Sequence, residues 1–209
     1  RFENYKQQPL EFVFDKSFTG KLSQFGLDPN RRTPSGIKAA IIREKGTNGE
    51  REMAYMLYLA GFDVKDVTMT DLISGRETLE DINMVVYCGG FSNSDVLGSA
   101  KGWAGSFLFN PKAKAALDNF YAREDTLSLG VCNGCQLMME LGLITPEDKK
   151  KGKMLHNDSH KFESNFLGVT VPMNRSVMFG SLSGSKLGIW VAHGEGKFSL
   201  PYPEDHYNV

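Results

Sequence analysis

The residues best suited to covalent chemistry lie in the segment Gly130-Val131-Cys132-Asn133-Gly134. A short apolar run before it predicts a buried strand, and the apolar stretch after it predicts a helix. The order strand, tight turn, helix is typical of a nucleophile elbow, here with cysteine as the nucleophile. The glycines leave room for the turn, and the N-terminus of the helix favours the thiolate of Cys132 over the thiol. A structural cysteine followed by an ordinary turn is the alternative interpretation.

A second segment, Cys88-Gly89-Gly90-Phe91-Ser92, follows another predicted strand. In an open α/β sheet, ligands bind beyond the carboxyl ends of the strands. Two consecutive glycines let backbone N–H groups approach such a ligand closely. We therefore expect the N–H of Gly90, or of Gly89, to form an oxyanion hole together with the N–H of Asn133. A pair of glycines on its own more often marks only a turn.

Two further patterns have chemical interpretations. His193 and Glu195 have the spacing of a general base and the carboxylate that orients it. Cys132 and Cys135 form a C-x-x-C pair, which occurs in redox and zinc sites. No second C-x-x-C and no nearby histidine completes a zinc set, so we expect no metal site.

The elements that position these residues alternate between strand and helix. Short apolar runs predict strands over residues Ile37–Ile42, Phe62–Val67, Met84–Cys88 and Leu127–Val131. Helices are predicted around Met53–Ala60, within Asp71–Ile82, and over Val96–Leu108, Pro111–Tyr121 and Cys135–Leu141. This alternation predicts an α/β fold with a parallel, doubly wound sheet. After Leu143 the pattern changes to hairpin strands at Phe166–Val171, Ser176–Phe179 and Leu187–Ala192.

The composition limits the class of protein. The 209 residues carry a formal net charge of −1, with no basic stripe for nucleic acid and no apolar run long enough to cross a bilayer. Three cysteines, an odd number, suit a reducing compartment, and we expect the cytoplasm. Residues 1–35 are polar and aromatic and end in a segment rich in proline and glycine, so we predict a domain boundary between residues 35 and 36.

Several of these segments together resemble one known family. They are Ile42–Glu44, Asp71–Leu72, Gly89–Ser92, Asp95–Gly98, Gly130–Gln136 and His193–Gly196. The sequence from about Ile37 to the end is similar to the glutaminase domain, of the class I glutamine amidotransferase type, of large-type phosphoribosylformylglycinamidine synthases. Residues 1–35 resemble the tail of the synthetase portion in the single-chain form of these enzymes.

The resemblance implies a flavodoxin-like, doubly wound, mostly parallel sheet with added β-hairpins in the C-terminal part. It implies a Cys-His-Glu triad in which Cys132 is the nucleophile, with the oxyanion hole on Gly90 or Gly89 and on Asn133. Gln136 takes the position that contacts the substrate glutamine. Residues Asn157, Ser159 and Phe162 take positions in another wall of the glutamine pocket.

The sequence departs from the family pattern at two places. The family's catalytic His and Glu lie in a Pro-His-x-Glu motif, which does not occur in residues 1–209. The domain 36–209 is therefore expected to be truncated at its C-terminus and inactive on its own, and His193 becomes a pocket or loop residue. Asn93 and Ser94 stand where relatives often have an aromatic residue and a glycine.

The activity that the resemblance implies is hydrolysis of glutamine. The ammonia serves the ATP-dependent conversion of formylglycinamide ribonucleotide to formylglycinamidine ribonucleotide in de novo purine biosynthesis. No cofactor is expected in this domain, because ATP and Mg²⁺ belong to the synthetase domain of the same polypeptide. Two alternatives stay open: another cysteine hydrolase on the same fold with His193 as base, and a non-catalytic docking domain.

Overall fold

The computed structural model describes residues 10–203 and 206–207, which form two compact units. The sheet unit comprises Leu22–Leu155 and Lys197–Pro201. The hairpin unit comprises the described residues within 1–21, His156–Gly196, and the described residues from Tyr202 onward. The boundary expected between residues 35 and 36 stays a prediction, and residues 1–9 of that lead-in lie outside the described residues.

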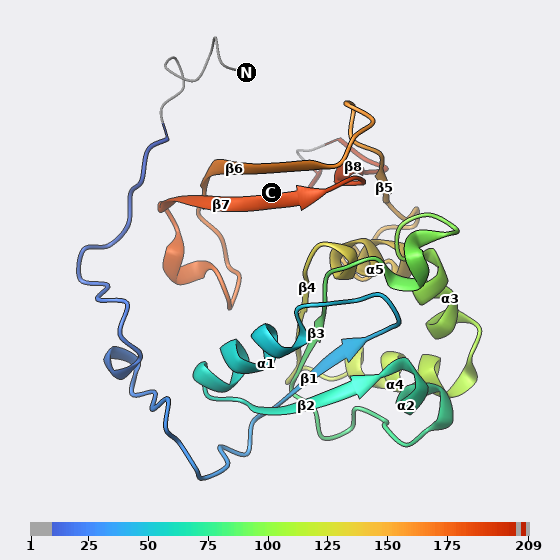
Figure 1. The fold of residues 1–209 in the computed structure, drawn as a ribbon, viewed down its shortest axis with the longest axis horizontal. Helices are drawn as coiled ribbons and strands as arrows, with labels where there is room; N and C mark the ends of the chain where they lie inside the picture. Colours follow the sequence, from blue (N-terminus) through green and yellow to red (C-terminus); the bar gives the residue numbers. More distant parts are fainter. Residues whose placement is uncertain (1–9, 204–205, 208–209) are drawn as a thin grey trace. The chain divides into compact units, whose positions relative to one another are not determined.

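A parallel sheet forms the centre of the sheet unit (Figure 1). Its strands are β1 (Lys38–Arg43), β2 (Asp63–Thr68), β3 (Met84–Tyr87) and β4 (Leu127–Gly130), in the order β2-β1-β3-β4. All three neighbouring pairs are parallel. β2 lies on one side of β1, and β3 and β4 follow on the other side, so the sheet is extended in opposite directions from β1. This strand order is the flavodoxin-like arrangement. The predicted α/β fold with a mostly parallel sheet is confirmed.

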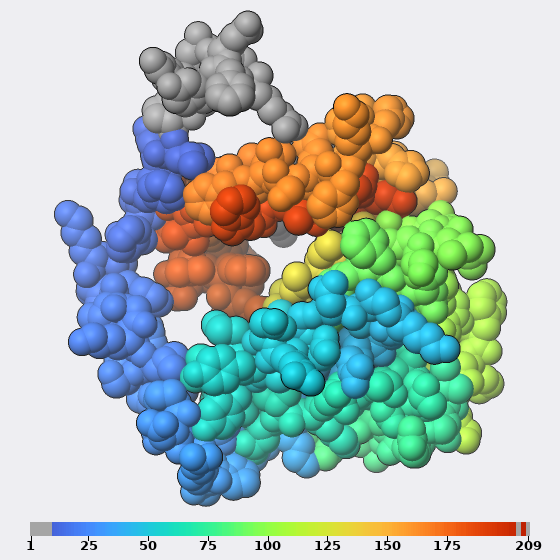
Figure 2. Space-filling view, viewed as in Figure 1, coloured from blue at the N-terminus to red at the C-terminus, as the bar shows by residue number. Residues whose placement is uncertain are grey.

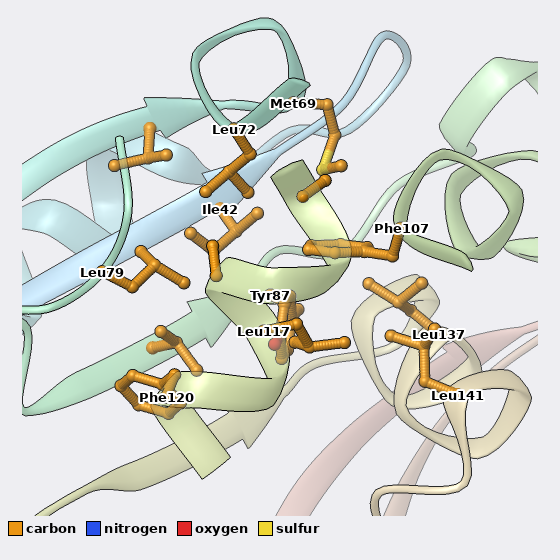
Figure 3. Close-up of a cluster of buried hydrophobic side chains, with 14 of the residues drawn as sticks. Ile42, Met69, Leu72, Leu79, Tyr87, Phe107, Leu117, Phe120, Leu137 and Leu141 are labelled. Carbon is orange, nitrogen blue, oxygen red and sulfur yellow. The ribbon is translucent and has the colours of Figure 1, made fainter. Parts of the chain in front are cut away.

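Successive side chains of a strand point to opposite faces of the sheet, so the core is divided into one cluster on each face. Ala40 and Ile42 of β1 belong to the larger cluster, with side chains from α2 (Met69–Ser74), α3 (Lys101–Leu108), α4 (Pro111–Tyr121) and α5 (Asn133–Leu141). Ala39 and Ile41 belong to a second cluster with Leu57 of α1 (Glu50–Leu59). Figure 3 shows Ile42 and Tyr87 of the sheet among helix side chains of the larger cluster. Figure 2 shows one face of the surface around this core, coloured by residue number.

The start of α3 corrects the sequence prediction. The helix begins at Lys101, whereas the pattern predicted Val96. Asn93, Ser94, Asp95 and Ala100 all have positive φ, between 48° and 57°, and a chain that repeatedly enters the left-handed region cannot continue as an α-helix. The residues between β3 and α3 therefore form a structured loop with one short 3₁₀ turn, Ser92–Asp95.

The hairpin unit is built on the antiparallel pair β6 (Glu163–Thr170) and β7 (Lys186–His193), which confirms two of the predicted strands. The strand predicted at Ser176–Phe179 was wrong. The hydroxyl of Ser176 accepts hydrogen bonds from the N–H groups of Met178 and Phe179, both at 3.2 Å. Such local bonds favour a turn over a strand, and the 3₁₀ helix Gly180–Leu182 follows.

Three short elements were not predicted from the sequence. The strands β5 (Lys153–Leu155) and β8 (Lys197–Ser199) pair antiparallel within the sheet unit, and Leu22–Phe25 is a 3₁₀ helix. In the part of the chain that the structure describes, no helix has the length and apolar character needed to span a bilayer.

Candidate active site

Cys132 occupies the turn between β4 and α5 in a backbone conformation that few residues adopt. Its φ is 53° and its ψ is −107°, outside the regions favoured by L-amino acids. Its side chain is exposed. A strained, exposed residue at a sharp strand-to-helix turn is the geometry of a nucleophile elbow, and the predicted local context of Cys132 is therefore present.

The two glycines that flank the turn are required by close backbone approaches. A Cβ atom at position 130 would lie 2.7 Å from the carbonyl oxygen of Gly134 and 2.8 Å from the backbone nitrogen of Cys135. A Cβ atom at position 134 would lie 2.1 Å from the carbonyl oxygen of Tyr87 in β3. Real Cβ atoms do not approach backbone atoms this closely, so any larger residue would displace the elbow.

The N-terminus of α5 gives this turn an electropositive end. Cys132 is the residue that precedes the helix, and Asn133 is its first residue, so the backbone N–H of Asn133 has no acceptor within the helix. No acidic side chain lies in the first turn. The helix dipole and the unpaired N–H favour negative charge at Cys132 or on an oxygen bound beside it.

The loop after β3 is fixed by the loop after β1. The N–H of Asn48 donates to the carbonyl of Gly89, and the N–H of Phe91 donates to the carbonyl of Gly46, both at 2.9 Å. Gly90 has φ of 123°, and a Cβ atom there would lie 2.6 Å from the carbonyl oxygen of Gly46. Among the described residues, the bonds that hold this loop leave the N–H of Gly90 unused.

Gly89 brings this loop against the nucleophile. A Cβ atom on Gly89 would lie 3.2 Å from the Cβ and 4.0 Å from the Sγ of Cys132. The structure thus brings together Gly89, Gly90, Cys132 and Asn133 at the carboxyl ends of β3 and β4, where the sequence placed the nucleophile and the oxyanion hole. Their roles in catalysis stay predictions.

The side chain of Asn133 connects the elbow to the loop after β3. It is fully buried, and its Oδ1 accepts a hydrogen bond from the N–H of Ser92 at 3.0 Å. Because Ser92 supplies a proton, the oxygen of the amide faces it and the NH₂ group faces the other way. That group donates to Gln136 Oε1 at 2.9 Å and to Asp95 Oδ1 at 3.3 Å.

Gln136 is therefore a buried partner of Asn133, with 5% of its surface exposed. Its assignment to the glutamine pocket stays a prediction. Asp95 was not singled out as a site residue, although the motif that contains it carried the family resemblance. No local pattern indicated its role, because its partner Asn133 is 38 positions away in the sequence.

The three cysteines are all free thiols, and they differ in exposure and in surroundings. Burial raises the pKa of Cys88 to about 11, with the carboxylates of Glu50 and Asp66 acting in the same direction. Burial also raises the pKa of Cys135, and the neighbouring Cys132 adds to that effect. Both therefore stay protonated near neutral pH, and of the three only Cys132 is exposed.

The other predicted site residues lie in the hairpin unit. Asn157 is buried and joins two segments: its Nδ2 donates to the carbonyl of His193 at 2.8 Å, and its Oδ1 is 2.9 Å from His193 Nδ1. Ser159 lies in an exposed turn, and Phe162 is 54% exposed just before β6.

The histidine of the alternative assignment thus has an amide partner. Asn157 Oδ1 can only accept, so the Nδ1 of His193 carries a proton in this bond. Nε2 is then the ring nitrogen that the alternative assignment would use as the base. The carboxylate of Glu195 lies 3.5 Å from Nδ1 of His156. His193 as base and Glu195 as its orienting carboxylate stay predictions.

Within residues 10–203 and 206–207, no group of three or more His, Cys, Asp or Glu side chains is arranged to hold a metal ion.

Comparison with known proteins agrees with this geometry. The model of the CobB/CobQ-like glutamine amidotransferase domain matches residues 36–209. The phosphoribosylformylglycinamidine synthase of Drosophila melanogaster is 44% identical over 175 residues, 81% of this chain and 13% of the relative. The human protein of that name is 44% identical over 189 residues, 83% of this chain and 14% of the relative. The chain spans between 12% and 15% of the length of such curated relatives.

Solved structures agree on the fold. A structure described as PurLQS from Thermotoga maritima has a TM-score of 0.61 and 26% identity, and the match covers 78% of this chain and 68% of that one. A glutamine amidotransferase from the same organism has a TM-score of 0.51 and 17% identity over 79% of this chain and 64% of that one, and shows the fold alone. Residues 36–209 match the family model and include the elbow at Cys132, so the chain belongs to the family of CobB/CobQ-like glutamine amidotransferase domains.

Proposed function

We propose that this chain is the glutaminase part of a phosphoribosylformylglycinamidine synthase. The observation that carries the proposal is the strained elbow that presents Cys132 at the N-terminus of α5, beside the N–H groups of Gly90 and Asn133. The synthase name shared by curated relatives at 44% identity supports the choice of substrate.

The first chemical step follows from the elbow. The thiolate of Cys132 attacks the side-chain amide carbon of glutamine, and negative charge develops on the amide oxygen. The N–H of Asn133 and the N–H of Gly90, or of Gly89, donate to that oxygen. Donors fixed in advance stabilise the tetrahedral intermediate because they need no reorganisation when the charge forms.

The second step releases ammonia and leaves a thioester on Cys132, which water then hydrolyses to glutamate. Departure of ammonia requires a proton donor, and the resemblance assigns this role to the histidine of a Pro-His-x-Glu motif. Gln136 of α5 is proposed to contact the substrate glutamine. The resemblance also assigns Asn157, Ser159 and Phe162 to glutamine binding.

The proposed partner is a synthetase domain of the same polypeptide. It would bind ATP and Mg²⁺, activate the amide oxygen of formylglycinamide ribonucleotide, and accept the ammonia to form the amidine. The much greater length of the curated relatives supports a multidomain enzyme. A reducing compartment such as the cytoplasm suits a nucleophile that has to stay a free thiol.

The test is the Cys132→Ala variant of the complete enzyme. Glutamine-dependent synthesis is expected to disappear while synthesis from added ammonia continues, because only the first needs the thiol. Cys135→Ala is the matched control and should keep most of the glutamine-dependent rate. Loss of both activities with an intact fold would contradict the assignment of Cys132.

A cysteine hydrolase that uses His193 is the second candidate, favoured by the bond that orients the His193 ring through Asn157. A glutamine-analogue electrophile separates it from the first. Labelling of Cys132 that glutamine blocks supports the glutaminase, and labelling that glutamine does not affect supports another hydrolase. Absence of labelling would indicate a docking domain without catalysis.

A further inference from the structure

Asp95 belongs to the loop after β3 and lies where this loop meets the elbow. One oxygen of its carboxylate, Oδ1, accepts from the backbone N–H of Ala100 at 3.2 Å and from the side-chain amide of Asn133 at 3.3 Å. The first bond ties Asp95 to the residue before α3. The second ties it to the first residue of α5.

Asn133 is the residue through which Asp95 acts. The backbone N–H of Asn133 is one proposed oxyanion donor, and its side chain holds the N–H of Ser92, two positions beyond the other donor, Gly90. The two protons of its NH₂ group are directed to Gln136 and Asp95. Without the Asp95 acceptor, one proton of a fully buried amide loses its partner, which favours rotation of the amide away from Ser92.

The segment from Gly89 to Ser92 is fixed from two sides. The backbone of Gly46 and Asn48 holds it on the β1 side, and Asn133 holds it on the α5 side. We propose that Asp95 is a positioning residue of the glutaminase: it fixes the Asn133 side chain, which in turn holds the loop that carries the second oxyanion donor. This inference rests on the proposed function, because it assigns a role within the same site.

Asp95 also adopts a left-handed backbone conformation, and the test has to separate this requirement from the role of its side chain. Asn93, Ser94 and Asp95 are consecutive left-handed residues, with φ of 51°, 55° and 48°. Asparagine, aspartate and glycine tolerate this conformation better than other residues. Asp95→Gly therefore keeps the backbone conformation and removes the acceptor, whereas Asp95→Asn keeps both. Ser94→Gly changes a neighbouring left-handed residue and leaves the acceptor in place.

The experiment measures kcat and KM for glutamine in the complete enzyme. Asp95→Gly is expected to lower kcat by about 10- to 100-fold with little change in KM, somewhat less than the roughly 10²- to 10³-fold loss on removal of an oxyanion donor. Asp95→Asn and Ser94→Gly should keep wild-type kcat. Ammonia-dependent synthesis should stay unchanged in all three variants, which verifies the fold.

Labelling of Cys132 adds a readout that a purely structural role would not change. A glutamine-analogue diazoketone requires the oxyanion donors, whereas iodoacetamide requires only an accessible thiolate. Asp95→Gly should slow the first reagent in proportion to kcat and leave the second unchanged. Equal slowing of both reagents, or loss of ammonia-dependent synthesis, would overturn the proposal.

A second pair of variants tests the Asp95–Asn133 contact directly. Asn133→Asp places two carboxylates against each other and should lower kcat. Adding Asp95→Asn removes the repulsion between the two carboxylates and should recover about tenfold of the loss, as residues in direct contact couple. No recovery, or wild-type kcat in Asp95→Gly, overturns the inference.

Cys132→Ala, measured alongside, separates this inference from the proposed function. If it stays active with glutamine, both fail. If it is inactive while Asp95→Gly is fully active, only the inference fails.

Discussion

Gly134 packs against the backbone of Tyr87 so closely that a Cβ atom on Gly134 would lie 2.1 Å from the Tyr87 carbonyl oxygen. The same oxygen accepts a hydrogen bond from the N–H of Val131 at 3.1 Å. One carbonyl of β3 therefore limits both the approach of α5 to the sheet and the position of the residue before Cys132.

The first prediction concerns this contact. Gly134→Ala should lower the free energy of unfolding by about 1 to 3 kcal/mol, because the methyl group meets backbone that cannot move aside. Gly105→Ala in α3 is the matched control. Its Cβ would meet only the ring of Phe109, at 3.7 Å, and alanine is about 1 kcal/mol better than glycine inside a helix. In urea denaturation, the free energy of unfolding should fall in Gly134→Ala and rise in Gly105→Ala. Equal stabilities of the two variants would refute the steric argument.

The elbow could be predicted from the sequence because strand, glycine, nucleophile, glycine and helix follow one another within a few residues. The contacts of Asn133 could not, since they join Asn133 to Ser92 and Asp95 across two neighbouring strands. For the same reason the pairing of β5 with β8 gave no local signal. The start of α3 was misplaced because apolar Val96 and Leu97 fit a helical pattern, while the left-handed backbone around them does not.

The second prediction concerns selective modification of the three cysteines. At pH 8, a small alkylating reagent should react first with Cys132, which is exposed, and slowly with Cys135, whose pKa burial raises. Cys88 should react only as the pH approaches its pKa of about 11. Mass spectrometry of peptides after short labelling measures the order. Fast labelling that persists in Cys132→Ser would show that another thiol is the reactive one.

The third prediction concerns the segment before β1. Arg31 bonds to the carboxylate of Asp63 at 2.8 Å, and the N–H groups of Ser35 and Gly36 donate to the same carboxylate. The Arg31 guanidinium and these N–H groups lower the pKa of Asp63 from 3.8 to about 2. Because the folded pKa is depressed, these bonds contribute fully above pH 3.8 and are lost as the pH falls toward 2.

Amide hydrogen exchange measures this. Protection factors at Ser35 and Gly36 should fall between pH 4 and 2, and Asp63→Asn should lower them already at neutral pH. Asp66→Asn, which alters the neighbouring pair with Arg43, is the control and should leave both amides unchanged. If protection at Ser35 and Gly36 persists in Asp63→Asn, the carboxylate does not anchor this segment.

The last prediction is that residues 1–209 alone turn over glutamine poorly even though the elbow is formed. The sequence contains no Pro-His-x-Glu motif, so the base and acid that the resemblance implies are lacking. Without them, the thiolate of Cys132 depends on the N-terminus of α5, and ammonia has to leave without a proton donor. General acid–base assistance contributes roughly 10²- to 10⁴-fold, so turnover should fall by at least that factor.

The competing possibility is that His193 supplies these roles, with its ring oriented by Asn157. An assay of ammonia release separates the two by comparing residues 1–209 with an extended chain that carries a Pro-His-x-Glu motif. We expect the extended chain to be far faster, and His193→Ala to have little effect on its kcat. If the short chain is as fast as the extended one and His193→Ala stops it, His193 is the base. Asn157→Ala should then lower kcat as well, because the neutral ring would lose the partner that fixes its tautomer.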